Sequence, residues 1–190
     1  MDGYKKVSYS QTTLTELMIP SYSNFGGKIH GGVILSLMDK IAYVCAAKHA
    51  DTYCVTASVD TVDFLAPVEV GELVSLLASV NYVGNSSLVI GIKVISENVR
   101  SHAVKHTNTS YITMVAIGDD NKPALVPGLI LQNAIETRRF YEALHRKQLK
   151  KAFKKEELNF KKTFEIQEYI EILKNERCFI EGSASDSFPG

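Results

Sequence analysis

A short segment near the N-terminus carries the residues best suited to chemistry. It reads Asn24-Phe-Gly-Gly-Lys-Ile-His30-Gly31-Gly32, and a single carboxylate, Asp39, follows seven residues later. Glycines at the start of a helix let backbone N–H groups approach a ligand oxygen, because no Cβ stands in the way. These N–H groups have no partner within the helix and lie at the positive end of its dipole. We therefore expect an oxyanion-binding helix start at Gly31 and Gly32, with Asp39 as general base or nucleophile.

Each of these residues also has a purely structural interpretation. In that interpretation the paired glycines simply allow a tight turn into the helix. Asn24 could orient a water or bind a carbonyl through its amide, or it could form a turn before Gly26. His30 could contact a substrate or cap the helix, and we place it among the supporting residues rather than the catalytic ones.

The segment after these glycines is expected to form one amphipathic helix, from Gly32 to about Lys48. Its apolar residues recur at the spacing of a single helical stripe, namely Ile34, Leu37, Met38, Ile41, Ala42 and Cys45. At 100° per residue, Asp39 lies about 140° from Ile34 and therefore off the buried stripe. The predicted helix thus exposes its carboxylate.

The middle of the chain has the composition of a β-sheet. Four segments rich in Val, Ile, Thr and Tyr are bounded by turn residues: Tyr53–Leu65, Leu73–Val83, Ser87–Ser96 and Thr107–Ile117. Gly84-Asn85 is expected at a hairpin tip. Residues 4–19 alternate loosely and suggest a first, edge-like strand, followed by a loop over residues 20–32. One long helix and a meander of long strands indicate an α+β fold in which the sheet covers the helix.

A second helical region is expected after Pro127, over residues 130–153, with a short helix at 164–175 and a loose tail from Ser183. Residues 136–162 hold ten Lys or Arg against four Glu, a net charge of +6, so the rest of the chain carries −6. We divide the chain into residues 1–128, a helix over 129–157 packing on or extending from them, and an extension over 158–190.

Composition narrows the class of protein. The 190 residues are 45% hydrophobic and 22% charged with zero net charge, as in a soluble globular protein. The chain lacks an apolar run of about 20 residues and the h-region of a signal peptide. Its three cysteines show no metal-ligand spacing, so we expect free thiols, no metal and a cytoplasmic location. Without a basic-aromatic pattern or a net charge, we expect neither nucleic acid nor a membrane as partner.

The motif N-x-x-G-x-x-H-G-G-x(6)-D, from Asn24 to Asp39, resembles the hotdog-fold acyl-CoA thioesterases, particularly the bacterial and brain-type acyl-CoA hydrolases. The similarity extends over residues 8–150. It includes Val55-Thr56-Ala-Ser-Val59-Asp60, Asp63-Phe64-Leu65-Ala-Pro67-Val68 with Gly71-Glu72, the hairpin Gly84-Asn85-Ser86-Ser87, and Thr113-Met-Val115-Ala116 with Pro123 and Val126-Pro127.

The resemblance implies a long helix wrapped by an antiparallel sheet, a homodimer with joined sheets, and often a trimer of such dimers. It implies hydrolysis of fatty acyl-CoA to free acid and CoA, with no separate cofactor. Asn24 and Asp39 fall where the family has its catalytic asparagine and acid, which come from opposite protomers in related enzymes. The helix geometry agrees, because Gly32 and Asp39 lie about 10 Å apart along the axis, too far to serve one small reaction centre.

The phosphates of CoA should meet cations and polar donors. Ser86, Ser87 and Arg100, taken to surround one hairpin end, are the first candidates, and Arg138 on the C-terminal helix is another. The segment His102–Asn108 is unusual for the family.

Two other functions stay open. A hydratase or dehydratase of acyl thioesters could use His30 with Asp39. A sensor that binds acyl-CoA without turnover is the non-enzymatic alternative, although the residues before Asn24 are too few for a DNA-binding domain.

Overall fold

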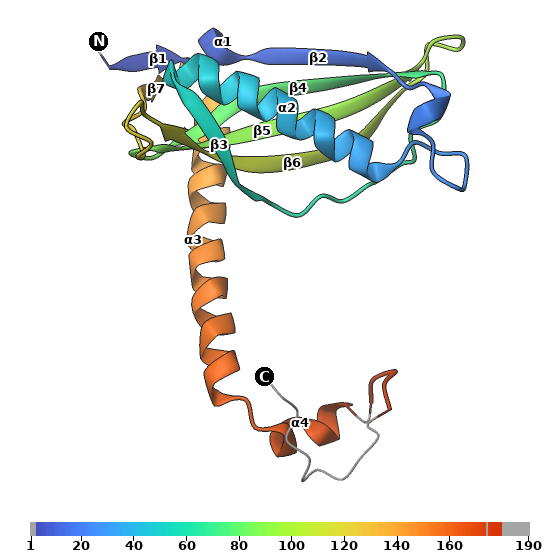
Figure 1. The fold of residues 1–190 in the computed structure, drawn as a ribbon, viewed down its shortest axis with the longest axis vertical. Coiled ribbons are helices and arrows are strands. Elements are labelled where there is room, and N and C mark those ends of the chain that lie inside the picture. The colour runs from blue at the N-terminus through green and yellow to red at the C-terminus, as the bar shows by residue number, and fades with distance from the viewer. Residues whose placement is uncertain (1–2, 174, 180–190) are drawn as a thin grey trace. The chain divides into compact units, whose positions relative to one another are not determined.

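The computed structural model describes residues 3–173 and 175–179, and the chain divides into two compact units, residues 1–144 and 145–190. The first unit contains a five-stranded sheet, a two-stranded ribbon and a long helix (Figure 1). Its elements are β1 Tyr4–Lys6, α1 Val7–Ser10, β2 Thr12–Leu17, the 3-10 turn Pro20–Tyr22, α2 Gly31–Ala50, β3 Tyr53–Val59, β4 Glu72–Val83, β5 Ser87–Asn98, β6 Val104–Ile117 and β7 Gly128–Ile130. Helix α3 Ala134–Thr163 continues into the second unit, where α4 Ile166–Leu173 follows.

The five-stranded sheet is antiparallel throughout, in the order β2-β4-β5-β6-β3. Strands β4 and β5 form the predicted hairpin at Gly84-Asn85, where the Gly84 N–H donates to the Ser87 carbonyl at 2.7 Å. Strand β7 pairs in parallel with β1 instead of joining the large sheet. Strands β2 and β3 are therefore the two edges of the large sheet.

Helix α2 lies across one face of this sheet and forms because its predicted apolar stripe is buried there (Figure 1). The helix begins one residue before the predicted start and ends two residues after the predicted end. It ends at Asp51, which adopts the left-handed conformation (φ 55°) and donates its N–H to the Ala47 carbonyl at 2.9 Å. The expected α+β fold, a long helix wrapped by an antiparallel sheet, is confirmed.

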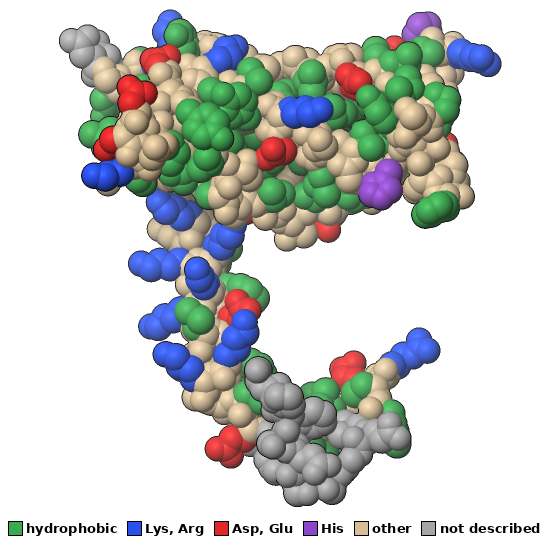
Figure 2. Space-filling view, in the orientation of Figure 1, with side chains coloured by type: hydrophobic (Ala, Val, Ile, Leu, Met, Phe, Trp, Pro, Cys, Tyr) green, Lys and Arg blue, Asp and Glu red, His purple; other side chains and the backbone are tan. Residues whose placement is uncertain are grey.

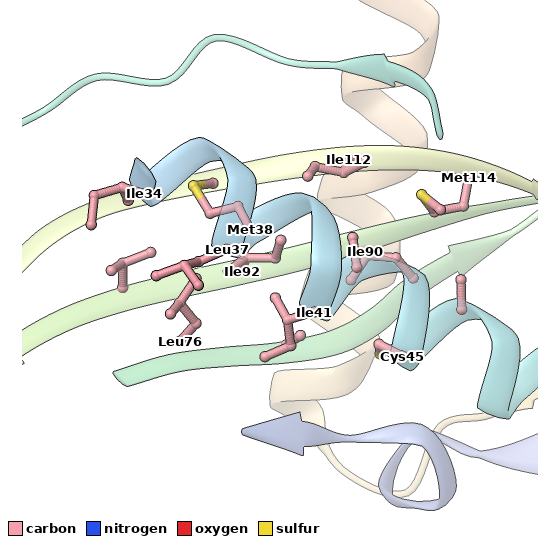
Figure 3. Packing of buried hydrophobic residues seen from close by; sticks show 14 of the residues in the cluster. Ile34, Leu37, Met38, Ile41, Cys45, Leu76, Ile90, Ile92, Ile112 and Met114 are labelled. Atoms are coloured by element: carbon pink, nitrogen blue, oxygen red, sulfur yellow. The ribbon is translucent and has the colours of Figure 1, made fainter. Parts of the chain in front are cut away.

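The core lies between α2 and the sheet. Figure 3 shows Ile34, Met38 and Ile41 of the helix in one buried cluster with Ile90 and Ile112 of the central strands. Each fully buried side chain of this kind contributes about 1.5–3 kcal/mol of burial free energy. Two of the free cysteines also lie in this core, where burial raises the pKa of Cys45 to about 12 and the pKa of Cys54 to about 11.

Three predicted elements differ from the structure. The strand expected over residues 4–19 is broken by α1, because Val7 and Ser10 are both buried and an extended strand cannot bury residues three apart on one face. Strand β3 ends at Val59 instead of Leu65, although residues 60–65 continue beside β6. Helix α3 begins at Ala134 because Asn133 caps it. The Asn133 Oδ1 accepts from the Glu136 N–H at 3.0 Å, and Glu136 Oε2 accepts from the Gln132 N–H at 2.7 Å.

The second unit is helical in its described part. It comprises the remainder of α3, from His145, and α4, with a rounded turn at residues 175–177. Within the described residues, no helix is both long and apolar enough to cross a membrane. The predicted loose tail from Ser183 lies outside the described residues.

Candidate active site

The loop before α2 is folded by the side chain of Asn24. Its Oδ1 accepts from the Gly26 N–H at 2.9 Å and from the Lys28 N–H at 3.2 Å, while its own N–H donates to the Lys28 carbonyl at 2.7 Å. Gly27 completes the turn with a φ of 75°, a conformation that favours glycine. Asn24 is exposed, and its oxygen holds the turn. The structural role considered for Asn24 is therefore present, and it leaves one amide donor for a ligand.

The start of α2 differs from the expectation in one respect. His30 is the N-cap, and its Nδ1 accepts the Gly32 N–H at 2.8 Å. A Cβ on Gly32 would approach this ring to 2.9 Å, which explains the glycine at this position. The Gly32 N–H, predicted to be an oxyanion donor, is already engaged by its own cap. Among the described residues none accepts the Gly31 N–H, so the Gly31 N–H is the donor that the helix start presents.

An aromatic ring covers this helix start. A Cβ on Gly31 would meet the ring of Phe64 at 3.4 Å, so that ring lies directly over the first residue of α2. Phe64 is itself half exposed, at 48%. A partly exposed ring beside a backbone N–H provides an apolar wall next to a polar donor, which suits a carbonyl-bearing ligand with an apolar body.

Asp39 lies on the exposed side of α2, as the periodicity predicts, and the structure gives it a partner that sequence reasoning missed. Thr56 of β3 donates its Oγ1 hydroxyl to Asp39 Oδ1 at 2.6 Å. A β-bulge falls between Thr56 and Ser58, and bulges of this kind re-aim side chains at edges and active sites. The only sign of this partner in the sequence is that Thr56 carries a hydroxyl and lies in the strand that follows the helix of Asp39.

The helix start and Asp39 do not form one centre within a protomer. Gly31 and Asp39 are eight residues apart on the same helix, a separation of about 12 Å along its axis. A reacting carbon must lie about 3 Å from both the base and the oxyanion donor. Both groups belong to a single small site only if a second copy supplies one of them.

The predicted CoA contacts are separated by the structure. Ser86 and Ser87 lie at the β4–β5 hairpin, whereas Arg100 lies in the turn between β5 and β6. These are opposite ends of β5, about 40 Å apart at the rise of an extended strand. The prediction that they surround one hairpin end is wrong, because a serine before a 12-residue strand and an arginine after it cannot meet in one protomer.

Arg138 is also remote from Asp39. It forms an ion pair with Glu142 at 2.9 Å on α3 and lines a cavity of about 450 Å³, together with Arg139, Lys93 and Tyr111. Lys93 and Tyr111 alternate along their strands with the buried residues Ile92 and Ile112, so they project from the opposite face of the sheet. Arg138 therefore lies on the sheet face away from α2.

Within the unusual segment His102–Asn108, Lys105 forms an internal ion pair. Lys105 donates to Glu72 Oε1 at 2.8 Å, and Ser96 donates to Glu72 Oε2 at 2.6 Å. Burial by itself would raise the pKa of Glu72, but hydrogen bonds from the Glu69 N–H, Lys105 and Ser96 outweigh it and lower this pKa. Glu72 is thus a satisfied structural carboxylate rather than a second candidate acid. Within the described residues, no three His, Cys, Asp or Glu side chains gather as a metal site.

Comparison with known proteins identifies the family to which the chain is similar. Residues 26–103 match the family model described as the thioesterase superfamily. The protein VdlD of Helicobacter pylori is 43% identical over 137 residues, covering 72% of this chain and 78% of its own length. An uncharacterized acyl-CoA thioester hydrolase of Bacillus subtilis, YkhA, is 36% identical and is covered over 70% of its length, against 64% of this chain.

Solved structures agree with these relatives. An apo-hexameric acyl-CoA thioesterase is 36% identical with a TM-score of 0.76, covering 78% of this chain and 96% of its own. The acyl-CoA hydrolase of Staphylococcus aureus, solved with butyryl-CoA and CoA, is 30% identical with a TM-score of 0.75, covering 90% and 99%. Alanine variants of that hydrolase at an asparagine, an aspartate and a threonine have also been solved. Those three positions have the same residue types and spacing as Asn24, Asp39 and Thr56. This chain belongs to the hotdog-fold thioesterase superfamily, among its acyl-CoA thioesterases, and is an enzyme that acts on thioesters.

Proposed function

We propose that this protein hydrolyses fatty acyl-CoA to a free acid and CoA at a site built around Asp39 and Thr56. The hydrogen bond from Thr56 to Asp39 Oδ1 carries this proposal. It holds the carboxylate in one orientation and leaves Oδ2 to accept a proton from water or to attack the thioester carbon. The spacing shared with the substituted positions of the S. aureus hydrolase supports this choice of residues.

The reaction needs few other groups. Asp39 accepts the proton of an attacking water as the C–O bond forms, or it attacks directly and forms a mixed anhydride that water then cleaves. The carbonyl oxygen gains negative charge, which the Gly31 N–H and the amide donor of Asn24 stabilise. The C–S bond then breaks and CoA leaves as a thiolate. One oxyanion donor of this kind contributes about 3–4 kcal/mol in other enzymes.

Two protomers complete the proposed site. The separation between Gly31 and Asp39 requires a second copy, and strand β3, which carries Thr56, is an unpaired edge of the sheet. The apolar side chains Tyr53 and Val59 are exposed on that edge, and such edges are normally covered by another strand. We propose a dimer in which two β3 edges meet and the α2 start of one protomer approaches Asp39 of the other. The apo-hexameric neighbour supports three such dimers.

The separated CoA candidates remain proposed contacts at the two ends of the sheet. Ser87 pairs with Val115, one residue along from Met114, which is the β6 partner of Thr56. Met114 and Thr56 face α2, so Ser87, which pairs with the next residue Val115, is at the same end of the sheet as the Asp39–Thr56 pair but is directed to the opposite face. Arg100 lies at the other end of the sheet and would reach the same CoA from the partner. His30 stays a proposed substrate contact through its Nε2. Arg138 is the weakest candidate, because it lies on the face of the sheet away from α2.

Free thiol release from acyl-CoAs of increasing chain length tests the proposal. We expect hydrolysis of at least one chain length by the purified protein. Addition of water to an enoyl-CoA without thiol release would instead show a hydratase. Tight binding without either reaction would show a sensor.

Mixing of inactive subunits tests the two-protomer site. Asn24→Ala and Asp39→Ala should each be inactive alone. After subunit exchange, about a quarter of the wild-type activity should return, because half of the dimers are mixed and each has one intact site. No recovery despite demonstrated exchange would place all the catalytic groups in one protomer.

A further inference from the structure

The part of α3 in the second unit has two opposed faces. Leu149, Phe153 and Phe160 form an apolar stripe, since they fall within about 40° of one another at 100° per residue. All three are exposed, at 56%, 67% and 45%. The other side, which we call the lysine face, spans about 140° and consists of Lys147, Lys150, Lys151, Lys154, Lys155, Lys161 and Lys162. Leu158 is the single large apolar side chain on that face.

The charge of this helix is concentrated well above that of the chain. Residues 145–163 contain eight Lys or Arg and two Glu, a net charge of +6, whereas the whole chain has a net charge of zero. Figure 2 shows the lysine and arginine side chains gathered along this helix. A block of one sign on an exposed amphipathic helix is the electrostatic footprint of a partner of the opposite sign.

The apolar stripe ends in an aromatic cluster. Phe160 contacts Phe164 at a ring separation of 5.4 Å, and Tyr169 of α4 lies 5.4 Å from Phe160 and 5.0 Å from Phe164. The three rings hold α4 against the end of α3 within the second unit. They extend the stripe into a broader apolar surface with a phenol, a composition that suits the boundary between lipid headgroups and acyl chains.

The geometry points to an anionic lipid bilayer as the partner of this helix. A basic amphipathic helix lies in the plane of such a surface, with its apolar face between the acyl chains and its lysines reaching the headgroups. Lys154 and Lys155 lie on either side of the middle of the lysine face, and their long side chains can extend toward headgroups along both sides of the helix.

Other partners fit these residues less well. Two copies of the helix would bring two charges of +6 together. Single-stranded nucleic acid needs aromatic rings beside the cations that hold its phosphates, but here the rings and the lysine face are on opposite sides. Charge complementarity therefore favours a lipid surface.

This inference departs from the expectation of no membrane partner, which relied on a net charge of zero. Opposite charges that cancel over the chain do not cancel at a surface that only one helix touches, because screening limits interactions to about 8–10 Å. Only one consequence rests on the proposed function, namely that a bound thioesterase would meet amphiphilic acyl-CoA at the bilayer. Lipid binding itself does not depend on that function.

Vesicle co-sedimentation of the full-length protein tests the inference. The probes are phosphatidylcholine vesicles, alone or with 30% phosphatidylglycerol, at low and high salt. We expect binding only to the anionic vesicles and a loss of most binding at high salt. The double variant Lys154→Gln/Lys155→Gln should lower the partition coefficient at least about tenfold, as expected for two lysines near an anionic surface. Leu149→Gln/Phe153→Gln should lower it by a similar factor or more, since both apolar anchors are lost.

A matched double variant supplies the control. Lys6→Gln/Lys122→Gln removes the same charge from exposed positions in the first unit and should leave the partition coefficient within about twofold of wild type. Circular dichroism and size in solution should be unchanged in all three variants.

Four results would overturn the inference. They are equal binding to neutral and anionic vesicles, no binding to anionic vesicles at low salt, and an equal loss in the Lys6/Lys122 control. The fourth is a smaller oligomer in the Leu149/Phe153 variant, which would assign the stripe to contacts between copies. Binding of duplex or single-stranded DNA with the same lysine dependence, without vesicle binding, would identify a nucleic acid as the partner instead.

Discussion

Helix α2 buries nine of its 20 residues, whereas α3 buries only Ala143 of its 30. The first helix is apolar and is stabilised mainly by packing against the sheet. The second is rich in Lys, Glu, Leu and Ala, which are good helix formers. It is supported by the Asn133 N-cap and by i,i+4 ion pairs such as Arg138–Glu142 at 2.9 Å and Lys161–Glu157 at 3.0 Å.

The difference shows where function can be encoded in each helix. In α2 the core fixes one side, so chemistry is left to the exposed side with Asp39 and to the helix start at Gly31. Beyond Leu144, α3 has no buried side chain among its described residues. Phe160 packs against Phe164 and Tyr169, whereas Leu149 and Phe153 stay exposed. We attribute their exposed side chains and the opposed lysine face to an external surface.

Matched truncations in the two helices test this difference in packing most strongly, because the expected losses of stability are very different. Ile41→Ala removes a side chain that is 2% exposed in α2 and should lower the free energy of unfolding by about 2–5 kcal/mol. Phe153→Ala in α3 should change it by no more than about 0.5 kcal/mol, because this ring is exposed. Urea unfolding at one fixed protein concentration measures both. Equal losses would mean that α3 is packed as tightly as α2.

The pH dependence of stability should sharpen the comparison through His49, the only histidine that α2 buries. Burial lowers the pKa of His49, outweighing its hydrogen bond to the Pro127 carbonyl at 3.0 Å. The unfolded chain therefore binds a proton that the folded chain does not, and stability falls as the pH drops below the ordinary histidine value of about 6.5. The loss for one proton cannot exceed about 1.4 kcal/mol per pH unit.

Unfolding midpoints between pH 8 and pH 5.5 measure this effect. His49→Gln, which keeps a donor for Pro127, should flatten the profile in this range. A profile as steep in the variant as in wild type would assign the dependence to another group. At lower pH, Glu72 should add a second loss, because its pKa is lowered and its stabilising contacts disappear as the pH falls through that value.

The sequence predicted those features that depend on local periodicity. The stripe from Ile34 to Cys45 placed α2 and exposed Asp39, and the turn residues at Gly84-Asn85 placed the central hairpin. Features that depend on contacts between distant segments were not predicted. The Thr56–Asp39 hydrogen bond joins β3 to α2, and the Lys105–Glu72 pair joins β6 to β4. Neither can be seen without the register of the sheet.

Two errors have the same origin. Ser86 and Arg100 were grouped because both are near turns, yet an intervening strand of 12 residues puts those turns at opposite ends. Gly32 was predicted to present its N–H, but the ring of His30 two residues earlier accepts it. Residue spacing gave the candidates, while the direction of the backbone and the side-chain rotamers decided which donors are presented.

The turnover number for thiol release by Asp39→Asn tests the central claim most directly. The variant keeps the size of the side chain and can still accept the Thr56 hydroxyl, but it removes the base or nucleophile. We predict a kcat at least about 100-fold below wild type with an unchanged circular dichroism spectrum and oligomer size. Near wild-type turnover by the folded variant would contradict the account.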